Sequence, residues 1–95
     1  MASPGVIELP EISSNDTSSG GWIVTVYDND HNTVDEVMAI LLLATECSPE
    51  EAYIETWEVH NLGRSVVHHS GEAECRRVAG VIATIGIKVE VSSEA

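Results

Sequence analysis

The chain has 95 residues, which is enough for one domain and too few for two. Acidic residues outnumber basic ones 16 to 4, which gives a formal charge of −12. This balance argues against nucleic acid and against an anionic membrane surface as partners, because both bind through clustered Lys and Arg. It suits a cationic ligand, although an acidic surface commonly serves solubility alone.

Cysteine usage and hydropathy predict a cytoplasmic protein. Cys47 and Cys75 have no C-x-x-C spacing and do not suggest a disulfide framework. We expect both to be reduced side chains in or beside helices. No segment approaches the run of about 18 apolar residues that spans a bilayer. The N-terminus has neither the basic residues nor the apolar run of a signal peptide.

Residues 1–21 are predicted to form a disordered arm. They are rich in Ser, Gly and Pro and offer too little apolar surface to offset the entropy of ordering. The folded domain is expected to span residues 22–92, followed by a tail at 93–95. It opens with a strand at 22–27, where aromatic and β-branched residues stand between turn-forming ones. Residues 28–32 then form a polar loop.

Two capped helices are predicted to follow this loop. Thr33 and Glu36 form a T-x-x-E capping box at the start of the first helix. Leucines at 41–43 make that helix apolar nearly all round, so we expect it at the centre of the core. The second helix starts at Ser48, in the signal S-P-E-E, and ends before Gly63, which can adopt the left-handed C-cap conformation.

A strand, a third helix and a last strand are predicted in the second half of the chain. A strand is predicted at 64–69, and Ser70 is expected to cap a third helix that Gly86 closes. Residues 87–91 alternate apolar and polar side chains, as a half-buried strand does. The order β-α-α-β-α-β indicates an α+β fold, with a three-stranded antiparallel sheet and three helices packed on one face.

Metal sites and catalytic motifs are not supported. Residues 28–32 copy the first ligand positions of an EF-hand loop, but Thr33 replaces the turn glycine and Ala39 stands where the bidentate Glu belongs. His68 and His69 are adjacent on a predicted strand and point to opposite faces, so they cannot share a metal ion. The sequence contains no nucleophile elbow and no H-E-x-x-H motif. We therefore expect no cofactor and no enzymatic activity.

Two segments together resemble the ClpS adaptors of Clp proteases. That family carries an N-D-D-x-T/N-x-M loop after its first strand and a V-H-x-x-G-x motif at the end of its second helix. The counterparts here are residues 28–34, D-N-D-H-N-T-V, and residues 59–64, V-H-N-L-G-R, with no gap needed between them. Residues 70–73 and 77–79 are similar to the family's T-A-E…K-V-A pattern in its third helix. The resemblance extends from Ile23 to about Val91.

The resemblance implies the same fold and a site for N-degrons, the substrates that begin with a bulky hydrophobic residue. It implies that Asp28, Asp30 and His60 surround the α-amino group and that Asn29 contacts the next backbone unit. Independently of the family, an ammonium has three donors and no acceptor, so two carboxylates and a neutral imidazole nitrogen suit it. The first side chain would, by the same resemblance, enter an apolar pocket lined by Asn32, Val34, Val37, Thr56, Val59 and Ile87.

The resemblance also implies a protein partner, the N-terminal domain of a Clp AAA+ unfoldase. Glu72 and Arg77 resemble the charges that relatives use to dock on it. Three site residues depart from the family pattern: Asp28 replaces Asn, and Val34 and Thr56 replace methionines. These changes leave the preferred N-terminal residue open.

Plainer interpretations remain beside this one. Asp28, Asp30 and Asn32 also suit a turn that caps a helix, and a histidine at a helix end commonly bonds carbonyl groups. Two other functions stay open as well. One is a structural domain like the C-terminal domain of the ribosomal stalk protein, and the other is a ClpS homologue that modulates the unfoldase without binding N-degrons.

Overall fold

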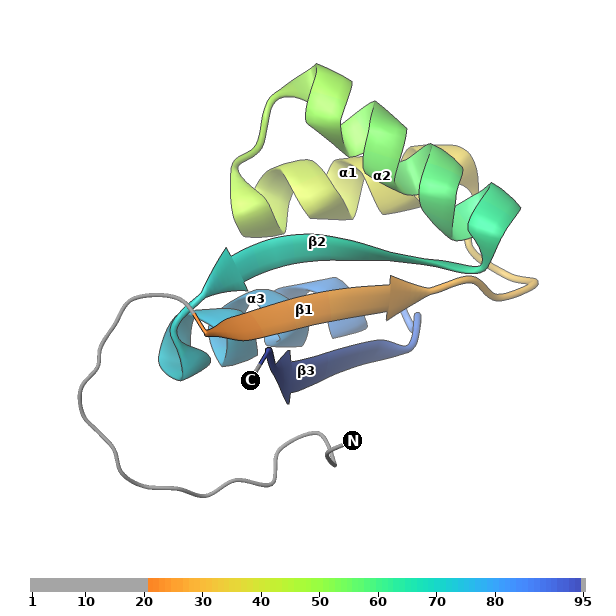
Figure 1. Ribbon diagram of the computed structural model, residues 1–95. Coiled ribbons are helices and arrows are strands. Elements are labelled where there is room, and N and C mark those ends of the chain that lie inside the picture. Colours follow the sequence, from red (N-terminus) through yellow and green to blue (C-terminus); the bar gives the residue numbers. More distant parts are fainter. Residues whose placement is uncertain (1–20, 95) are drawn as a thin grey trace.

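The computed structural model describes residues 21–94 and contains the predicted order of elements (Figure 1). The predicted arm lies outside the described residues except for Gly21, and so does Ala95 of the predicted tail. The strands and helices, in chain order, are β1 (Trp22–Tyr27), α1 (Val34–Thr45), α2 (Pro49–Leu62), β2 (Arg64–Ser70), α3 (Glu72–Ala83) and β3 (Val89–Ser93).

The sheet has the order β2-β1-β3, and both pairings are antiparallel. Its register shifts between Val24, opposite His68, and Thr25, opposite Val66, so that Val67 is an extra residue in β2. Such a bulge bends the strand and increases its twist. At the other edge, the backbone N–H of Glu94 donates to the carbonyl of Gly21 at 2.8 Å, which holds the two ends of the folded domain side by side.

The predicted helix starts are confirmed. Thr33 accepts a hydrogen bond from the backbone N–H of Glu36, and the Glu36 carboxylate accepts one from the backbone N–H of Thr33. Ser48 and Glu51 form the same reciprocal pair at the start of α2. Each box satisfies two of the backbone donors that a helix start leaves unpaired. Both helices therefore begin where their local sequence directs.

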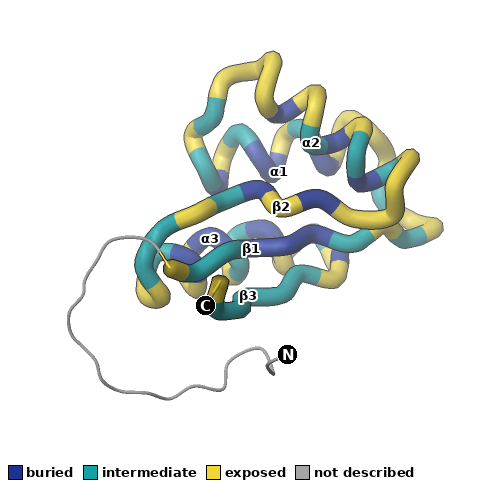
Figure 2. Tube along the Cα trace, in the orientation of Figure 1, coloured by how far each residue is buried: buried dark blue, intermediate teal, exposed yellow. Residues whose placement is uncertain are grey.

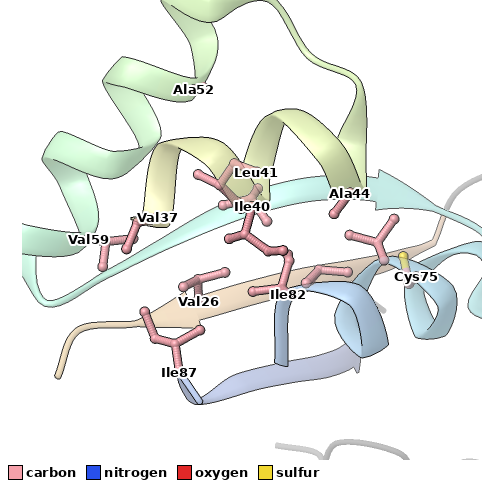
Figure 3. Close-up of a cluster of buried hydrophobic side chains, with 13 residues drawn as sticks. Val26, Val37, Ile40, Leu41, Ala44, Ala52, Val59, Cys75, Ile82 and Ile87 are labelled. Carbon is pink, nitrogen blue, oxygen red and sulfur yellow. The ribbon is translucent and has the colours of Figure 1, made fainter. Parts of the chain in front are cut away.

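The helices pack on one face of the sheet, as predicted (Figure 1). α2 contacts β2, α3 contacts all three strands, and α1 lies between α2 and α3. Figure 2 shows the buried residues on the facing sides of these elements. The core between the layers is aliphatic, apart from one thiol (Figure 3), and consists of Val24, Val26, Val37, Ile40, Leu41, Ala44, Ala52, Val59, Val67, Cys75, Val78, Ile82 and Ile87.

α1 is central to the core, as expected, but this helix is not buried all round. Leu41 is fully buried, whereas Leu43 has 69% of its surface exposed. Two residues along a helix correspond to a rotation of about 200°, so neighbouring leucines of one run must face different environments. α1 is central to the core by one face only.

The boundaries of α3 and β3 also differ from the sequence-based expectation. Ser70 belongs to β2, and the N-cap of α3 is Gly71, which makes no side-chain cap bond. The helix ends at Ala83, and a turn leads to Gly86 at φ +83°, a left-handed conformation that favours glycine. The last strand is Val89–Ser93 rather than 87–91, because the turn delays entry into the sheet.

The two leucines of α1 provide a direct test of this packing. Leu41→Ala should lower the free energy of unfolding by about 2–5 kcal/mol, because it opens a cavity in the core. Leu43→Ala, the matched control on the same helix, should change it by less than about 0.5 kcal/mol. Urea denaturation followed by circular dichroism measures both. Equal losses for the two variants would contradict the orientation of α1.

Candidate functional site

The loop between β1 and α1 lies against the end of α2 (Figure 1). At the start of the loop, the backbone N–H of Asp28 donates to the carbonyl of Gly63 at 2.9 Å. Near its end, the carbonyl oxygen of Asn32 lies 3.4 Å from Nε2 of His60. Two segments that are about thirty residues apart in the chain thus meet at one end of the sheet.

Two asparagines fix the shape of this loop. Oδ1 of Asn29 accepts hydrogen bonds from the backbone N–H groups of His31 and Asn32, at 3.0 and 2.9 Å. Nδ2 of Asn29 donates to Oδ1 of Asn32 at 2.8 Å. Nδ2 of Asn32 in turn donates to the carbonyl of Ile85 at 2.9 Å. Both amide side chains therefore form the scaffold of the loop, which is the plainer interpretation for these two residues.

The two aspartates of the loop are in a different situation. Asp28 and Asp30 are exposed, and within residues 21–94 neither carboxylate has a hydrogen-bond or ion-pair partner. Carboxylates that shaped the turn or capped α1 would accept bonds from backbone N–H groups, as Asn29 and Thr33 do. The local structure thus leaves these two negative charges available.

His60 adds a further acceptor to the site. Its Nδ1 lies 3.1 Å from the carbonyl oxygen of Thr56, one turn earlier in α2, and its Nε2 faces Asn32. A neutral imidazole has one N–H, so it can donate to only one of these carbonyls at a time. When Nδ1 donates to Thr56, the lone pair of Nε2 and the carbonyl of Asn32 are two adjacent acceptors. A donor-rich group satisfies both.

The apolar residues predicted to line a pocket fall into two groups. Val37, Thr56, Val59 and Ile87 are buried, and three of them belong to the hydrophobic core (Figure 3). Val34 is 46% exposed and Asn32 is half-buried, so only these two reach the surface. The family resemblance assigned Thr56 and Val59 to the pocket, but their face of α2 packs inward. The pocket itself stays a prediction.

Two features of the site have no signal in the sequence. The bond from Asn32 to Ile85 joins residues from different ends of the chain, and only the fold brings them together. The hydroxyl Oγ1 of Thr56 is buried and has no hydrogen-bond partner within the described residues. A buried hydroxyl without a partner costs free energy, so this atom favours a polar neighbour in the site.

Glu72 and Arg77, predicted to dock an unfoldase, lie on the exposed side of α3. Each takes part in an intramolecular ion pair. Arg76 donates to Glu72 at 2.8 Å, and Arg77 donates to Glu74 at 2.7 Å and to the carbonyl of Ala44 at 3.2 Å. The Arg77 guanidinium lowers the pKa of the Glu74 carboxyl to about 2. Whether a partner binds these residues stays a prediction.

Glu55, on the side of α2 that faces β2, has the most perturbed carboxyl on this helix. Its Oε1 is buried and has no hydrogen-bond partner among residues 21–94. Burial and the negative charges of Glu51 and Glu58 raise its pKa to about 7. α2 contains four glutamates and no Lys or Arg, so its own sequence provides nothing to relieve this repulsion.

The described part of the chain contains neither a candidate metal site nor a membrane-spanning helix. Within residues 21–94, no three His, Cys, Asp or Glu side chains are grouped so that they could hold a metal ion. No helix in this range combines the length and the apolar character needed to cross a bilayer.

Comparison with known proteins identifies a family. Residues 18–85 match the family described as ATP-dependent Clp protease adaptor protein ClpS. The match covers both site segments, 28–34 and 59–64, and ends before Ile87. No curated protein matches the chain.

The raised pKa of Glu55 predicts how stability depends on pH. The ordinary carboxyl pKa of the unfolded chain is near 4.5, so between that pH and about pH 7 the folded state binds the extra proton. The free energy of unfolding therefore falls as pH rises through this window. Glu55→Gln should remove this term and raise stability at pH 8 by about 1 kcal/mol, after allowance for solvent screening.

Urea denaturation at several pH values measures the effect. Glu50→Gln, an exposed change on the same helix, is the matched control and should keep the wild-type pH dependence. A stability gain for Glu55→Gln that is the same at pH 4 and pH 8 would contradict the assignment.

Proposed function

The chain belongs to the ClpS family of adaptors for the ATP-dependent Clp protease, and on this premise we propose that it binds N-degrons and delivers them to a Clp unfoldase. The family is one of adaptor proteins rather than of enzymes. The proposed ligand is the free N-terminus of a protein whose first residue is bulky and hydrophobic.

The observation that supports this ligand is the set of unsatisfied acceptors beside the loop. Asp28 and Asp30 offer carboxylates without intramolecular partners, and Nε2 of His60 faces the carbonyl of Asn32. A set made only of acceptors repels anions and suits a group made only of donors. An α-ammonium has three N–H donors and a positive charge, and each charge-assisted bond is worth about 1.5–3 kcal/mol.

This chemistry separates chain ends from chain interiors. An internal peptide bond has a single N–H and no charge, so it would leave most of the acceptors unpaired. Leaving a desolvated acceptor unpaired costs about 1–3 kcal/mol. In the proposed mode, the loop and His60 thus provide the selectivity for a free amino group.

Affinity would come from the first side chain, which we place against Val34 and above Val37 and Val59. Val34 and Val37 lie one turn apart on α1, so they share a face, as Val59 and His60 of α2 do with Thr56. A large aromatic side chain buries about 150–250 Å², which at about 25 cal/mol per Å² gives roughly 4–6 kcal/mol before ordering costs. Because Val37 and Val59 are fully buried, entry requires a shift of α1 against α2.

Delivery would use the surface of α3. Membership of the family supports contact with the Clp machinery, and we assign Glu72 and Arg77 to the contact with the N-terminal domain of the unfoldase. Both are exposed, and their ion pairs with Arg76 and Glu74 hold them in fixed positions. Exposed pairs of this kind are weak, so a partner can exchange them at little cost.

The burial of Val37, Thr56, Val59 and Ile87 favours a second candidate function. In this alternative the chain modulates the unfoldase without binding N-degrons, because the core has no room for a further side chain. The peptide experiment below distinguishes the two functions.

A peptide that begins with Phe should bind, and the same peptide with an acetylated N-terminus should bind at least about a hundredfold more weakly. Acetylation removes the charge and two N–H donors but leaves the first side chain intact. Isothermal titration calorimetry with the full chain measures both. Equal binding of the pair would contradict the amine site, and no binding of either would favour the second candidate function.

His60→Ala should weaken binding of the free peptide about tenfold or more, because one acceptor of the ammonium is lost. His69→Ala, an exposed change on the edge strand β2, is the matched control and should leave binding unchanged. Thermal unfolding of both variants verifies that the fold persists. If the two variants bind alike, His60 is not part of the site.

A further inference from the structure

The outer face of α2 presents large apolar side chains to solvent. Ala52, Thr56 and Val59 of this helix face the core, and Figure 2 shows the side away from the sheet as exposed. On that side lie Tyr53, Ile54 and Trp57, which are 57%, 55% and 49% exposed. We call these three residues the α2 patch.

The α2 patch is continuous and hollowed. Trp57 lies four residues after Tyr53 and three after Ile54, so the three side chains are neighbours on the helix surface. One shallow hollow of about 390 Å³ is lined by Pro49, Glu50, Tyr53 and Ile54. A second of about 330 Å³ is lined by Tyr53, Ile54, Trp57 and Glu58. The two hollows share Tyr53 and Ile54, and we call the two together the groove of α2.

This composition is that of a binding surface. Exposed apolar side chains scattered singly are ordinary, but Tyr and Trp placed together beside hollows are the residues that dominate the energetics of protein interfaces. The core does not need them, since α2 already packs on β2 and α1 through its opposite face.

The negative charge of α2 indicates which kind of partner can bind the α2 patch. The groove is flanked by the carboxylates of Glu50 and Glu58, with Glu51 and Glu55 also on α2, and the helix has no Lys or Arg. A second copy would place these glutamates against their own equivalents, since a two-fold interface pairs a surface with itself. Residues 1–20 contain three acidic and no basic residues, so they too would be repelled.

We propose that the α2 patch docks a basic amphipathic helix of a partner protein, with its apolar residues in the groove and its Lys or Arg side chains beside Glu50 and Glu58. Apolar anchors at positions i, i+3, i+4 and i+7 of a helix match a groove that runs along another helix. The four carboxylates of α2 have no Lys or Arg on their own helix, so they gain from an added cation.

The α2 patch adjoins the proposed N-degron site, because His60 lies three residues after Trp57 on the same helix. Thr56 and Val59 point inward and His60 contacts the loop, whereas the side chains of the patch are exposed to solvent. The docking surface does not depend on the proposed function.

The test uses Trp57 as a reporter in the full chain. Trp22→Phe leaves it as the only tryptophan. The probe is a helical peptide of about 15 residues made of Leu and Lys, with Leu at the spacing above. It should shift the emission of Trp57 to the blue in a saturable way, and its affinity should fall with added salt. A scrambled peptide of the same composition should bind at least about tenfold more weakly, and a Leu/Glu helix should not bind.

Substitutions on α2 test whether the peptide binds at the α2 patch. Ile54→Ala should weaken binding of the Leu/Lys helix about tenfold, and Glu50→Lys should weaken it and reduce its salt dependence. Leu43→Ala, an equally exposed apolar change on α1, is the matched control and should leave binding unchanged.

Several results would overturn the proposal. Equal binding of the scrambled peptide, or equal loss in Ile54→Ala and Leu43→Ala, would mean that the attraction is general. A dimer in sedimentation that Ile54→Ala dissociates would identify a second copy as the occupant. A red shift of Trp57 emission in full-length Leu9→Ser would identify the chain's own N-terminal segment.

Discussion

The site depends on the way the chain passes from α2 into β2. Gly63 ends the helix at φ +94°, a left-handed conformation that other residues rarely adopt, and its N–H bonds to the carbonyl of Val59. The turn brings Arg64 directly into register with Tyr27 of β1. The Gly63 carbonyl then accepts the N–H of Asp28, so the loop begins at a fixed point beside α2. His60 and the loop meet because this one residue reverses the chain.

Around that junction, the polar groups divide into those that support the loop and those that do not. Asn29 and Asn32 use their amides within the loop and toward Ile85. Within the described residues, the carboxylates of Asp28 and Asp30 have no hydrogen-bond or ion-pair partner, so the fold does not depend on their charge. These two carboxylates are part of the net charge of −12, and without partners they add repulsion rather than stability. Their charge is therefore available to a ligand rather than used by the fold.

Much of the fold follows from local sequence signals. Thr33 and Ser48 cap helices through hydrogen bonds to residues three positions later in the chain. Because these bonds lie within one short segment, the sequence predicts both helix starts well. The start of α3 was misplaced because Gly71 uses no side chain as a cap. The sequence motifs at residues 28–34 and 59–64 indicated two segments of one site, and the fold brings these segments together. The burial of the predicted pocket residues could not be predicted from the sequence. Helical spacing shows which residues share a face, but it does not show whether that face packs tightly, as it does at Val59.

The central position of β1 has a mechanical consequence. This strand is hydrogen-bonded to β2 on one side and to β3 on the other, and both pairings are antiparallel. A force applied at Gly21 along the strand would load both ladders in shear, so that many hydrogen bonds must yield together rather than one after another. The domain is thus built to resist traction from its N-terminal side, which is a useful property in an adaptor of an ATP-dependent protease.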